Sequence, residues 1–519
     1  MMWWNSSQLM LLLLACLLGC EIIEGFSVQS RSLWTRHNSV SGSKALSLRD
    51  PMLKQNEYRI CDALVKKRFQ LNLSEIQNDV NVPEYRDESS ESIFSIISSI
   101  FNAAFLVAGT TIGGGFLALP TVVAPIGFYP AACTLVGVWL YFLAQSFVLV
   151  ECIVRARKGQ QYSILGDNYN KEESENILEE DPGITAVARL VLGERFELLV
   201  GILLTILIEA TLVSQISRAG MLFQNNYQVG CWLSALSISL VVFGPKSGLA
   251  FATKANSVLT TLFIISCITV FGIGSRAADW TRLASIGGSI NVSSITSAIP
   301  TFLQLLVYGE IVSTVCRLLK YKINRIHGAI FVGSFMTLCL QIGWSALGIS
   351  LVAPASGVID PINVLLGQSG PVRVPLFCLA ITAILTTILG SYLALESTYK
   401  DVITQRKTSK DVHVYPSLLK RMKVASIVTI PASIIASTSP SIFLRAIDFA
   451  GSYPVLLLWG VIPPILTMMQ RSRDFEKMGK EVDSIEYQKL QNTSGPSLWL
   501  KALTAISAGS VIGKLFGLL

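Results

Sequence analysis

A glycine-rich segment interrupts the first long apolar stretch of the chain. Residues 93–150 contain no Asp, Glu, Lys, Arg or His, and Gly109-Thr110-Thr111-Ile112-Gly113-Gly114-Gly115 lies among them. A helix in lipid leaves no backbone polar group unpaired, so such a break is tolerated only where the freed groups face protein, water or a ligand. Amides freed at the start of a half-helix suit a carboxylate.

Six residues of this break are predicted to bind a substrate. The glycines allow close approach of the backbone, and the threonines add hydroxyl groups: Gly109, Thr110, Thr111, Gly113, Gly114 and Gly115. The alternative is a helix-packing motif, because small residues also line tight helix contacts. Three consecutive glycines break a helix, which favours the binding interpretation.

A second apolar stretch has a similar interruption at Tyr308-Gly309-Glu310. Tyr308 and Gly309 are predicted to complete the substrate site. Glu310 is predicted to carry a coupling proton, or to pair with a substrate ammonium group when ionised, since an acid within a membrane span is costly and usually functional. The alternative is a structural acid paired with Arg317.

Two further acids lie within apolar spans and are secondary candidates. Glu209 either contributes to the site or pairs with Arg218, and Glu396 either contributes or lies at a membrane boundary. Arg445 and Asp448 are three residues apart and are predicted to form a local pair.

Polar and aromatic residues near the breaks are weaker candidates. Tyr308, Phe302 and Trp344 are candidates for an aromatic-accepting pocket, or else ordinary packing residues. Ser214 and Gln215 rank below them.

No residue pattern predicts a metal site, a cofactor or a catalytic group. The ten cysteines are scattered without a Cys-x-x-Cys pair, and the three histidines lie in the N-terminal segment or at the edges of predicted loops. This distribution disfavours an enzyme that works within the membrane.

Composition indicates an integral membrane protein. The 519 residues are 51% hydrophobic and 14% charged, with a mean hydropathy of +0.54. The net charge of +7 comes from short basic clusters between apolar runs, which is typical of membrane loops and gives no support for nucleic-acid binding.

Hydropathy predicts an all-α polytopic fold with about eleven spans. They lie near 93–124, 127–150, 196–220, 229–244, 255–275, 295–318, 327–353, 374–399, 422–438, 442–469 and 497–518. The breaks fall in the first and sixth spans, which predicts two inverted five-helix repeats over 92–275 and 276–470. A linker and an eleventh helix then occupy 471–519. Alternate loops are rich in Lys and Arg, which predicts the N-terminal tail on the positive side and the C-terminus on the other.

The N-terminal region reads as a targeting segment. An apolar run over 9–18 resembles a signal-peptide core, and 27–49 contains seven serines, four bases and no acid, as in transit peptides. With Phe26 at a plausible new N-terminus, residues 1–50 resemble the two-part plastid presequences of algae with secondary plastids. An ordinary secretory or mitochondrial leader, with a plasma or other endomembrane location, is the alternative. Residues 51–91 are predicted to be a polar tail.

Several motifs together resemble the tryptophan/tyrosine permease family, most closely its plant and algal branch. The glycine break continues as Phe116-Leu117-Ala118-Leu119-Pro120 and is followed by Gly127-Phe128 and Trp139; further matches are Ala298-Ile299-Pro300, Asp360-Pro361 and Asp448-Phe449-Ala450-Gly451. The resemblance covers about 93–469.

The resemblance implies a broken-helix, inverted-repeat fold and proton-coupled uptake of aromatic or other neutral amino acids. Its partners would be an amino acid, a proton and the bilayer, with no nucleic acid and no cofactor. A sensor with the same fold and a transporter of another small amine or organic acid remain alternatives. Members usually carry a His after the aromatic residue of the sixth-span break, whereas Gly309 and Glu310 follow Tyr308 here.

Overall fold

The structure of the protein is a computed structural model. It describes residues 93–166, 183–223, 226–243, 248–285, 292–351, 372–404, 418–477 and 491–517. The chain divides into two compact units, and the smaller contributes only residues 93–98 to the described part. The account below concerns the larger unit, from Ser99 onward. The predicted targeting segment and polar tail lie outside the described residues.

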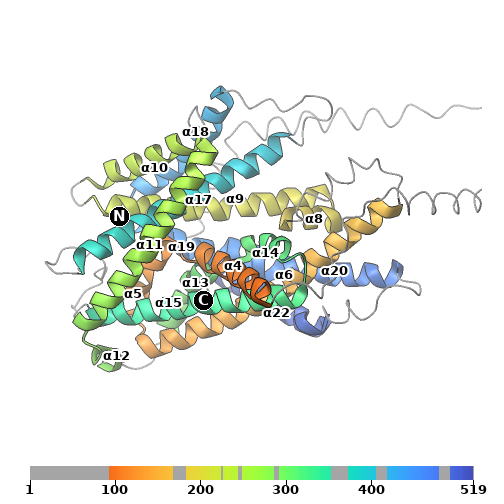
Figure 1. The fold of residues 1–519 in the computed structure, drawn as a ribbon, viewed down its shortest axis with the longest axis horizontal. Helices are drawn as coiled ribbons and strands as arrows, with labels where there is room; N and C mark the ends of the chain where they lie inside the picture. The colour runs from red at the N-terminus through yellow and green to blue at the C-terminus, as the bar shows by residue number, and fades with distance from the viewer. Residues whose placement is uncertain are drawn as a thin grey trace, which may run out of the picture. The chain divides into compact units, whose positions relative to one another are not determined.

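Every regular element in the described part of the chain is helical (Figure 1). In chain order they are α4 (Ile93–Thr111), η2 (Gly114–Ala118), α5 (Leu119–Val123), α6 (Phe128–Gly166), α8 (Ile184–Leu192), α9 (Glu194–Met221), α10 (Tyr227–Phe243), α11 (Gly248–Ala277), α12 (Arg282–Ser285), α13 (Val292–Leu306), η3 (Gly309–Ile311), α14 (Val312–Leu318), α15 (Ile323–Leu351), α17 (Arg373–Thr404), α18 (Leu418–Ser437), α19 (Ile442–Ala450), η4 (Gly451–Val461), α20 (Ile462–Lys477) and α22 (Ser497–Leu515). The predicted all-α class is confirmed.

Eight described helices are long and apolar enough to cross a membrane, and a bent pair makes nine. The two remaining predicted spans coincide with α10 and α18, of which α10 has 17 residues and α18 has a short apolar part at Ala425–Ser437. Each predicted span therefore corresponds to a helix or a bent helix pair. The total of eleven crossings stays a prediction.

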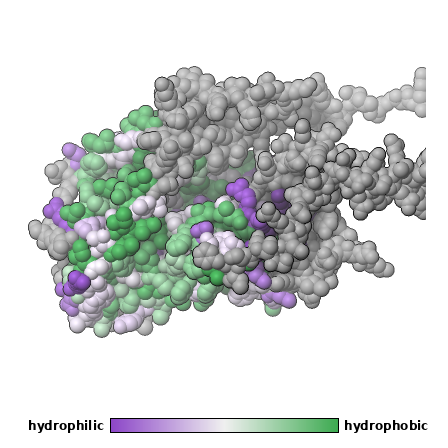
Figure 2. Space-filling view, in the orientation of Figure 1, coloured by the Kyte–Doolittle hydropathy of each residue, from purple (hydrophilic) through white to green (hydrophobic). Residues whose placement is uncertain are grey.

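In the view of Figure 2, apolar residues cover much of the described surface. Large hydrophobic side chains are exposed along several of the long helices, among them Leu140, Leu240, Ile268, Phe331 and Ile434. A water-facing surface would cover such residues, whereas lipid is a favourable neighbour for them. The protein is an integral, multi-pass membrane protein.

The first span is broken where the glycines predict it. α4 ends at Thr111, Gly113 is extended with φ −118° and ψ −173°, and the chain restarts as the 3₁₀ helix η2. The two halves meet at an angle of 53°. The first hydrogen bond of the new helix runs from the Phe116 amide to the Gly113 carbonyl at 3.0 Å, so the helical ladder does not continue across the break.

The sixth span is interrupted at its predicted position as well. α13 ends at Leu306, Tyr308 has a non-helical φ of −142° and ψ of 16°, and η3 and α14 complete the span. α13 crosses the start of η4 very closely, because a Cβ on Gly451 would collide with the Pro300 carbonyl. Two motifs that are far apart in the sequence therefore meet at one backbone contact.

The last helix, α22, packs against the tenth span. That span consists of α19, the π-helical segment η4 and α20. Lys514 of α22 forms an ion pair with Asp448 of α19 at 3.4 Å. The predicted pair between Arg445 and Asp448 is therefore wrong: the carboxylate is matched by a lysine 66 residues away instead of by its helical neighbour.

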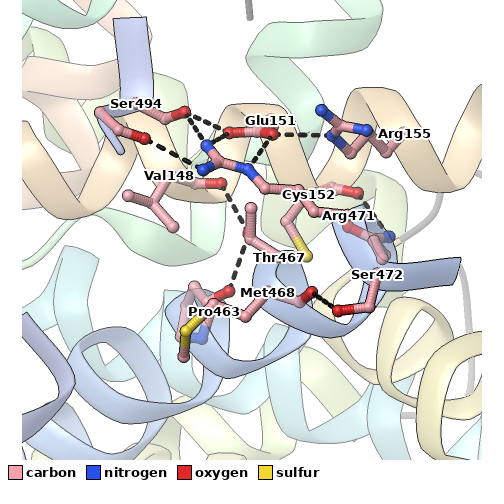
Figure 3. Close-up of polar contacts among 12 residues, drawn as sticks. Val148, Glu151, Cys152, Arg155, Pro463, Thr467, Met468, Arg471, Ser472 and Ser494 are labelled. Carbon is pink, nitrogen blue, oxygen red and sulfur yellow. Dashed lines mark hydrogen bonds and ion pairs between the residues drawn. The ribbon is translucent and has the colours of Figure 1, made fainter. Parts of the chain in front are cut away.

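A buried ionic cluster joins the other end of α22 to the second and tenth spans (Figure 3). Glu151 of α6 accepts hydrogen bonds from Arg155 at 2.7 Å and from two nitrogens of Arg471 of α20 at 2.9 and 2.6 Å. Arg471 also donates to the Gly495 carbonyl at 3.0 Å and to Ser494, just before α22. Arg155 and Arg471 belong to the basic clusters between apolar runs, yet both side chains are buried.

Removing the Glu151 charge is expected to destabilise the protein strongly. Glu151→Gln leaves two buried guanidinium groups without their shared carboxylate, a type of loss that costs about 3–5 kcal/mol. Glu197→Gln is the control, because its pair with Arg189 at 3.8 Å is partly exposed and such pairs contribute about 0–1 kcal/mol. Thermal unfolding in detergent measures both. Equal melting temperatures for the two variants would contradict the role assigned to Glu151.

Candidate functional site

The first break is enclosed by side chains from two distant helices. A Cβ on Gly113 would lie 2.8 Å from the Oγ1 of Thr387 in α17, and a Cβ on Gly114 would collide with the Oε1 of Gln215 in α9. A Cβ on Gly115 would lie 2.6 Å from Leu305 of α13. Each of the three glycines is therefore needed for a different close contact. The third and eighth spans therefore flank the break.

The backbone amides of this break are only partly satisfied. The Gly114 amide donates to the Thr387 hydroxyl at 2.8 Å, and that hydroxyl donates in turn to the Ala383 carbonyl. The amides of Gly113 and Gly115 have no acceptor among the described residues. Unpaired amides at the start of a helix can receive a carboxylate.

Three of the six predicted residues lie apart from this arrangement. Gly109 is exposed in the last turn of α4, with no atom within 4 Å of where its Cβ would be. The hydroxyls of Thr110 and Thr111 donate to carbonyls of their own helix, Thr111 to Val107 at 2.7 Å. The structure therefore brings Gly113, Gly114 and Gly115 together and leaves Gly109, Thr110 and Thr111 on α4.

At the second break, Gly309 lies against an aromatic ring. A Cβ on Gly309 would collide with the indole of Trp459 in η4. Tyr308 is buried and its hydroxyl donates to Ser146 of α6 at 3.3 Å, which ties the break to the second span. Trp459 is a neighbour of the site that sequence reasoning missed, because no local pattern links η4 to residue 309.

Glu310 is exposed at the start of η3. Within the described residues it forms no ion pair, so the alternative pairing with Arg317 is absent. A carboxylate at mid-span is stable only where water or a partner can reach it. The exposed position of Glu310 is thus compatible with a group that gains and loses a proton.

The secondary candidates have different surroundings. Glu209 is buried in α9 near Tyr392 of α17. Its suggested partner Arg218 lies nine residues further on, about half a turn away around the helix axis, and its guanidinium is 5.0 Å from the ring centre of Phe443. The pairing of Glu209 with Arg218 is therefore wrong. Glu396 belongs to α17, but its side chain lies outside the described part.

An aromatic cluster adjoins the first break. Phe116, the residue directly after Gly115, stacks on Trp344 of α15 with ring centres 4.9 Å apart. Phe263 and Phe271 of α11 contact Phe116 and Trp344 respectively, at 6.5 and 6.3 Å. This places Trp344 beside the break, as the sequence suggested. Its Nε1 is buried without an acceptor among the described residues.

The described residues contain no group of three or more His, Cys, Asp or Glu that is arranged to hold a metal ion. The chemistry available at the two breaks is instead that of backbone donors, neutral hydroxyls and amides, aromatic rings and one exposed carboxylate. This set can bind and release a small charged molecule without covalent change.

Two interrupted helices within a multi-pass bundle define a membrane transporter with discontinuous helices. The model of the tryptophan/tyrosine permease family matches residues 97–484, and the chain belongs to that family. The chain is therefore a permease and not an enzyme.

Two bacterial relatives illustrate the similarity. The "Tyrosine-specific transport system 1" of Haemophilus influenzae is 24% identical over 381 residues, which cover 69% of this chain and 87% of the relative. The "Low affinity tryptophan permease" of Escherichia coli K12 is 23% identical over 401 residues, covering 73% and 88%.

Two solved structures are also similar to this chain, at lower sequence identity. MhsT in complex with L-phenylalanine has a TM-score of 0.47 and 14% identity, covering 80% of this chain and 97% of the other. A manganese transporter of Eremococcus coleocola, in complex with an aromatic bis-isothiourea compound, has a TM-score of 0.45 and 14% identity, covering 81% and 96%.

Gly114→Ala is expected to reduce transport by about tenfold or more, because the added methyl group meets Gln215 and lies 3.3 Å from the backbone of Ile384. Gly109→Ala is the matched control in the same glycine-rich segment, with open space around its Cβ. Uptake by purified, folded protein in proteoliposomes checks both. Wild-type flux in Gly114→Ala would remove this glycine from the site.

Proposed function

We propose that this protein is a secondary active transporter that carries aromatic amino acids together with protons. Family membership supports transport of an amino acid, and the names of the bacterial relatives refer to tyrosine and tryptophan. The observation that carries the proposal is the first break itself, where unpaired amides stand beside a cluster of aromatic rings.

The two parts of an aromatic amino acid match the two parts of this region. The amides of Gly113 and Gly115 receive the carboxylate, which replaces the acceptors that the broken helix lacks. The aromatic side chain would pack against the cluster of Phe116 and Trp344, whose rings stack on each other at a separation that aromatic pairs prefer.

Counterflow with a panel of labelled amino acids tests this function. Proteoliposomes loaded with unlabelled tryptophan or tyrosine are expected to accumulate the labelled aromatic amino acid. They are expected to exclude acidic and basic amino acids, because no described charge lies at the glycines to match a charged side chain. Robust counterflow of glutamate or lysine, with none of the aromatic amino acids, would refute the proposed substrate class. Binding without counterflow would indicate a sensor.

Glu310 is proposed as the proton-coupling group. It is exposed at the second break, and no ion pair with a described residue holds it in one charge state. A carboxyl that alternates between protonated and ionised forms can link proton movement to substrate movement when the two helix breaks change position together.

Glu310→Gln is expected to abolish pH-driven accumulation and to retain exchange of substrate across the membrane, because exchange at a permanently neutral site needs no net proton movement. Uptake under an imposed pH gradient, at constant sodium, is compared with counterflow in the same vesicles. Undiminished accumulation by the variant would show that Glu310 is structural. Sodium-dependent, pH-indifferent uptake by the wild type would exclude proton coupling altogether.

The proposed architecture is two inverted five-helix repeats over 92–275 and 276–470, followed by the linker and eleventh helix of 471–519. Its support is the position of the two breaks, in the first and the sixth spans. Inverted repeats place two such breaks side by side at mid-depth, where a substrate can contact both.

The proposed location is the plastid inner envelope of an alga with a secondary plastid; a plasma or other endomembrane location is the alternative. The support is the targeting-like composition of residues 1–50. A fluorescent protein fused to these residues is expected to enter the plastid of a secondary-plastid alga, and Phe26→Ala is expected to impair entry. Secretion of both fusions would refute the plastid location, and unaltered entry of the variant would remove Phe26 from the argument.

A further inference from the structure

A buried arginine lies directly beyond the glycine break. Gln215 of α9 contacts Gly114, and Arg218 follows three residues later, one turn further along the same face of α9. Only 1% of the surface of Arg218 is exposed. Its charge therefore lies inside the third span, close to the glycines but outside the site described above. The proposed transport cycle leaves this charge without a role.

An aromatic ring covers the guanidinium group. The ring centre of Phe443 in α19 lies 5.0 Å from the Cζ of Arg218, within the range of a cation–π contact. The Nη1 of Arg218 also donates to the Sδ of Met221 at 3.6 Å. Phe443 is itself buried, so the charge and the ring form a closed contact between the third and tenth spans.

This contact lies on the α5 side of the break, which is the side toward which the chain continues after Gly115. Ala118 follows Gly115 by three residues, one turn of a 3₁₀ helix. It packs in one buried cluster with Phe443, and Met221 packs against that cluster. Arg218 and Phe443 therefore belong to a layer that joins the first, third and tenth spans next to the glycines.

Arg218 has a different kind of neighbour from the other two buried arginines of the bundle. Arg155 and Arg471 both bind the carboxylate of Glu151. The face of a ring attracts a cation more weakly than a carboxylate does, because a carboxylate forms two charge-assisted hydrogen bonds with a guanidinium group. A guanidinium group also keeps its charge in proteins. An incoming carboxylate can therefore displace the ring of Phe443 from Arg218.

We propose that Arg218 and Phe443 form a gate on the α5 side of the site, and that Arg218 receives the carboxylate of the incoming substrate before the glycine amides do. This inference rests on the proposed function, because the ligand is the same amino acid. The predicted orientation places this side opposite the N-terminal tail. While the ring covers the guanidinium group, the gate is closed. When the carboxylate replaces the ring, the substrate lies one helical turn, about 5 Å, from the amides of Gly113 and Gly115.

Binding kinetics of labelled L-tyrosine test the gate. Association and dissociation rate constants are measured on detergent-solubilised wild type, Phe443→Leu and Arg218→Met. The first variant keeps an apolar side chain and removes the ring, and the second keeps a long side chain and removes the charge. Phe449→Leu is the matched control. Phe449 is a buried phenylalanine on the same helix, and its ring centre lies 5.5 Å from that of Tyr453.

Phe443→Leu is expected to raise both rate constants by about threefold or more and to keep the Kd within about threefold, because opening no longer breaks the cation–π contact. Arg218→Met is expected to lower the association rate constant by about tenfold, because the substrate carboxylate loses its first contact. Adding Phe443→Leu to Arg218→Met is expected to change either rate constant by less than about twofold, since no cation is left for the ring to cover. Phe449→Leu is expected to behave as the wild type.

A second measurement does not depend on the substrate. Ala118→Cys places a thiol in the buried cluster that contains Phe443. Its reaction with a small water-soluble thiol reagent is followed at residue 118 by mass spectrometry, which separates it from the native cysteines. In this background, Phe443→Leu is expected to speed the reaction by about fivefold, and Phe449→Leu by less than about twofold.

The other outcomes overturn the inference in distinguishable ways. Equal effects of Phe443→Leu and Phe449→Leu on the rate constants and on the thiol reaction would show that Phe443 is an ordinary packing residue. An unchanged association rate constant in Arg218→Met would refute the carboxylate contact. Failure of the wild type to bind either L-tyrosine or L-tryptophan would refute the proposed function. A faster thiol reaction in Phe443→Leu would then still support the gate, whereas an unchanged reaction would refute the gate as well.

Discussion

Satisfaction of backbone polar groups within an apolar bundle is the constraint on which the rest of the structure depends. A helix that stops at mid-span frees amides and carbonyls, and lipid offers them no partners. In this protein, Thr387 of α17 supplies one partner across 273 residues of sequence. The glycines are needed because Thr387, Gln215 and Leu305 already occupy the space where side chains would begin. The helix break therefore depends on the side chains that surround it.

The second break is supported by packing more than by hydrogen bonds. Gly309 lies against Trp459 of η4, and the next residue, Gly460, accepts a hydrogen bond from Gln145 of α6 and leaves room for Ser507 of α22. The π-helical winding of η4 places these neighbouring residues toward different helices. α22 therefore supports the region of Gly309 through η4.

The sequence predicted the spans and both breaks well, because apolar length and consecutive glycines act locally. The sequence did not predict which residues of distant helices pair with one another. Glu151 directly follows the uncharged stretch, and its partner Arg471 lies 320 residues away in a basic cluster at the end of an apolar run. The spacing of three residues suggested that Arg445 forms an ion pair with Asp448. In the structure Asp448 forms its ion pair with Lys514. Helix packing determines which charged residues pair within the bundle, and this packing cannot be read from a single sequence.

The two ionic contacts of α22 also explain how a weakly apolar helix can occupy the bundle. Its mean hydropathy is only 1.2 over the best window, yet its polar ends are matched by protein groups: Ser494 and Gly495 by Arg471 before the helix, and Lys514 by Asp448 near its end. Contacts at opposite ends fix α22 antiparallel to the tenth span, because a slip of one turn would separate both at once. Paired charges between helices can fix register without adding much net stability. η4 lies between these two contacts, and its Trp459 packs against Gly309. A movement of the second break therefore either slides Gly309 across the Trp459 indole or carries η4 and α22 along with it.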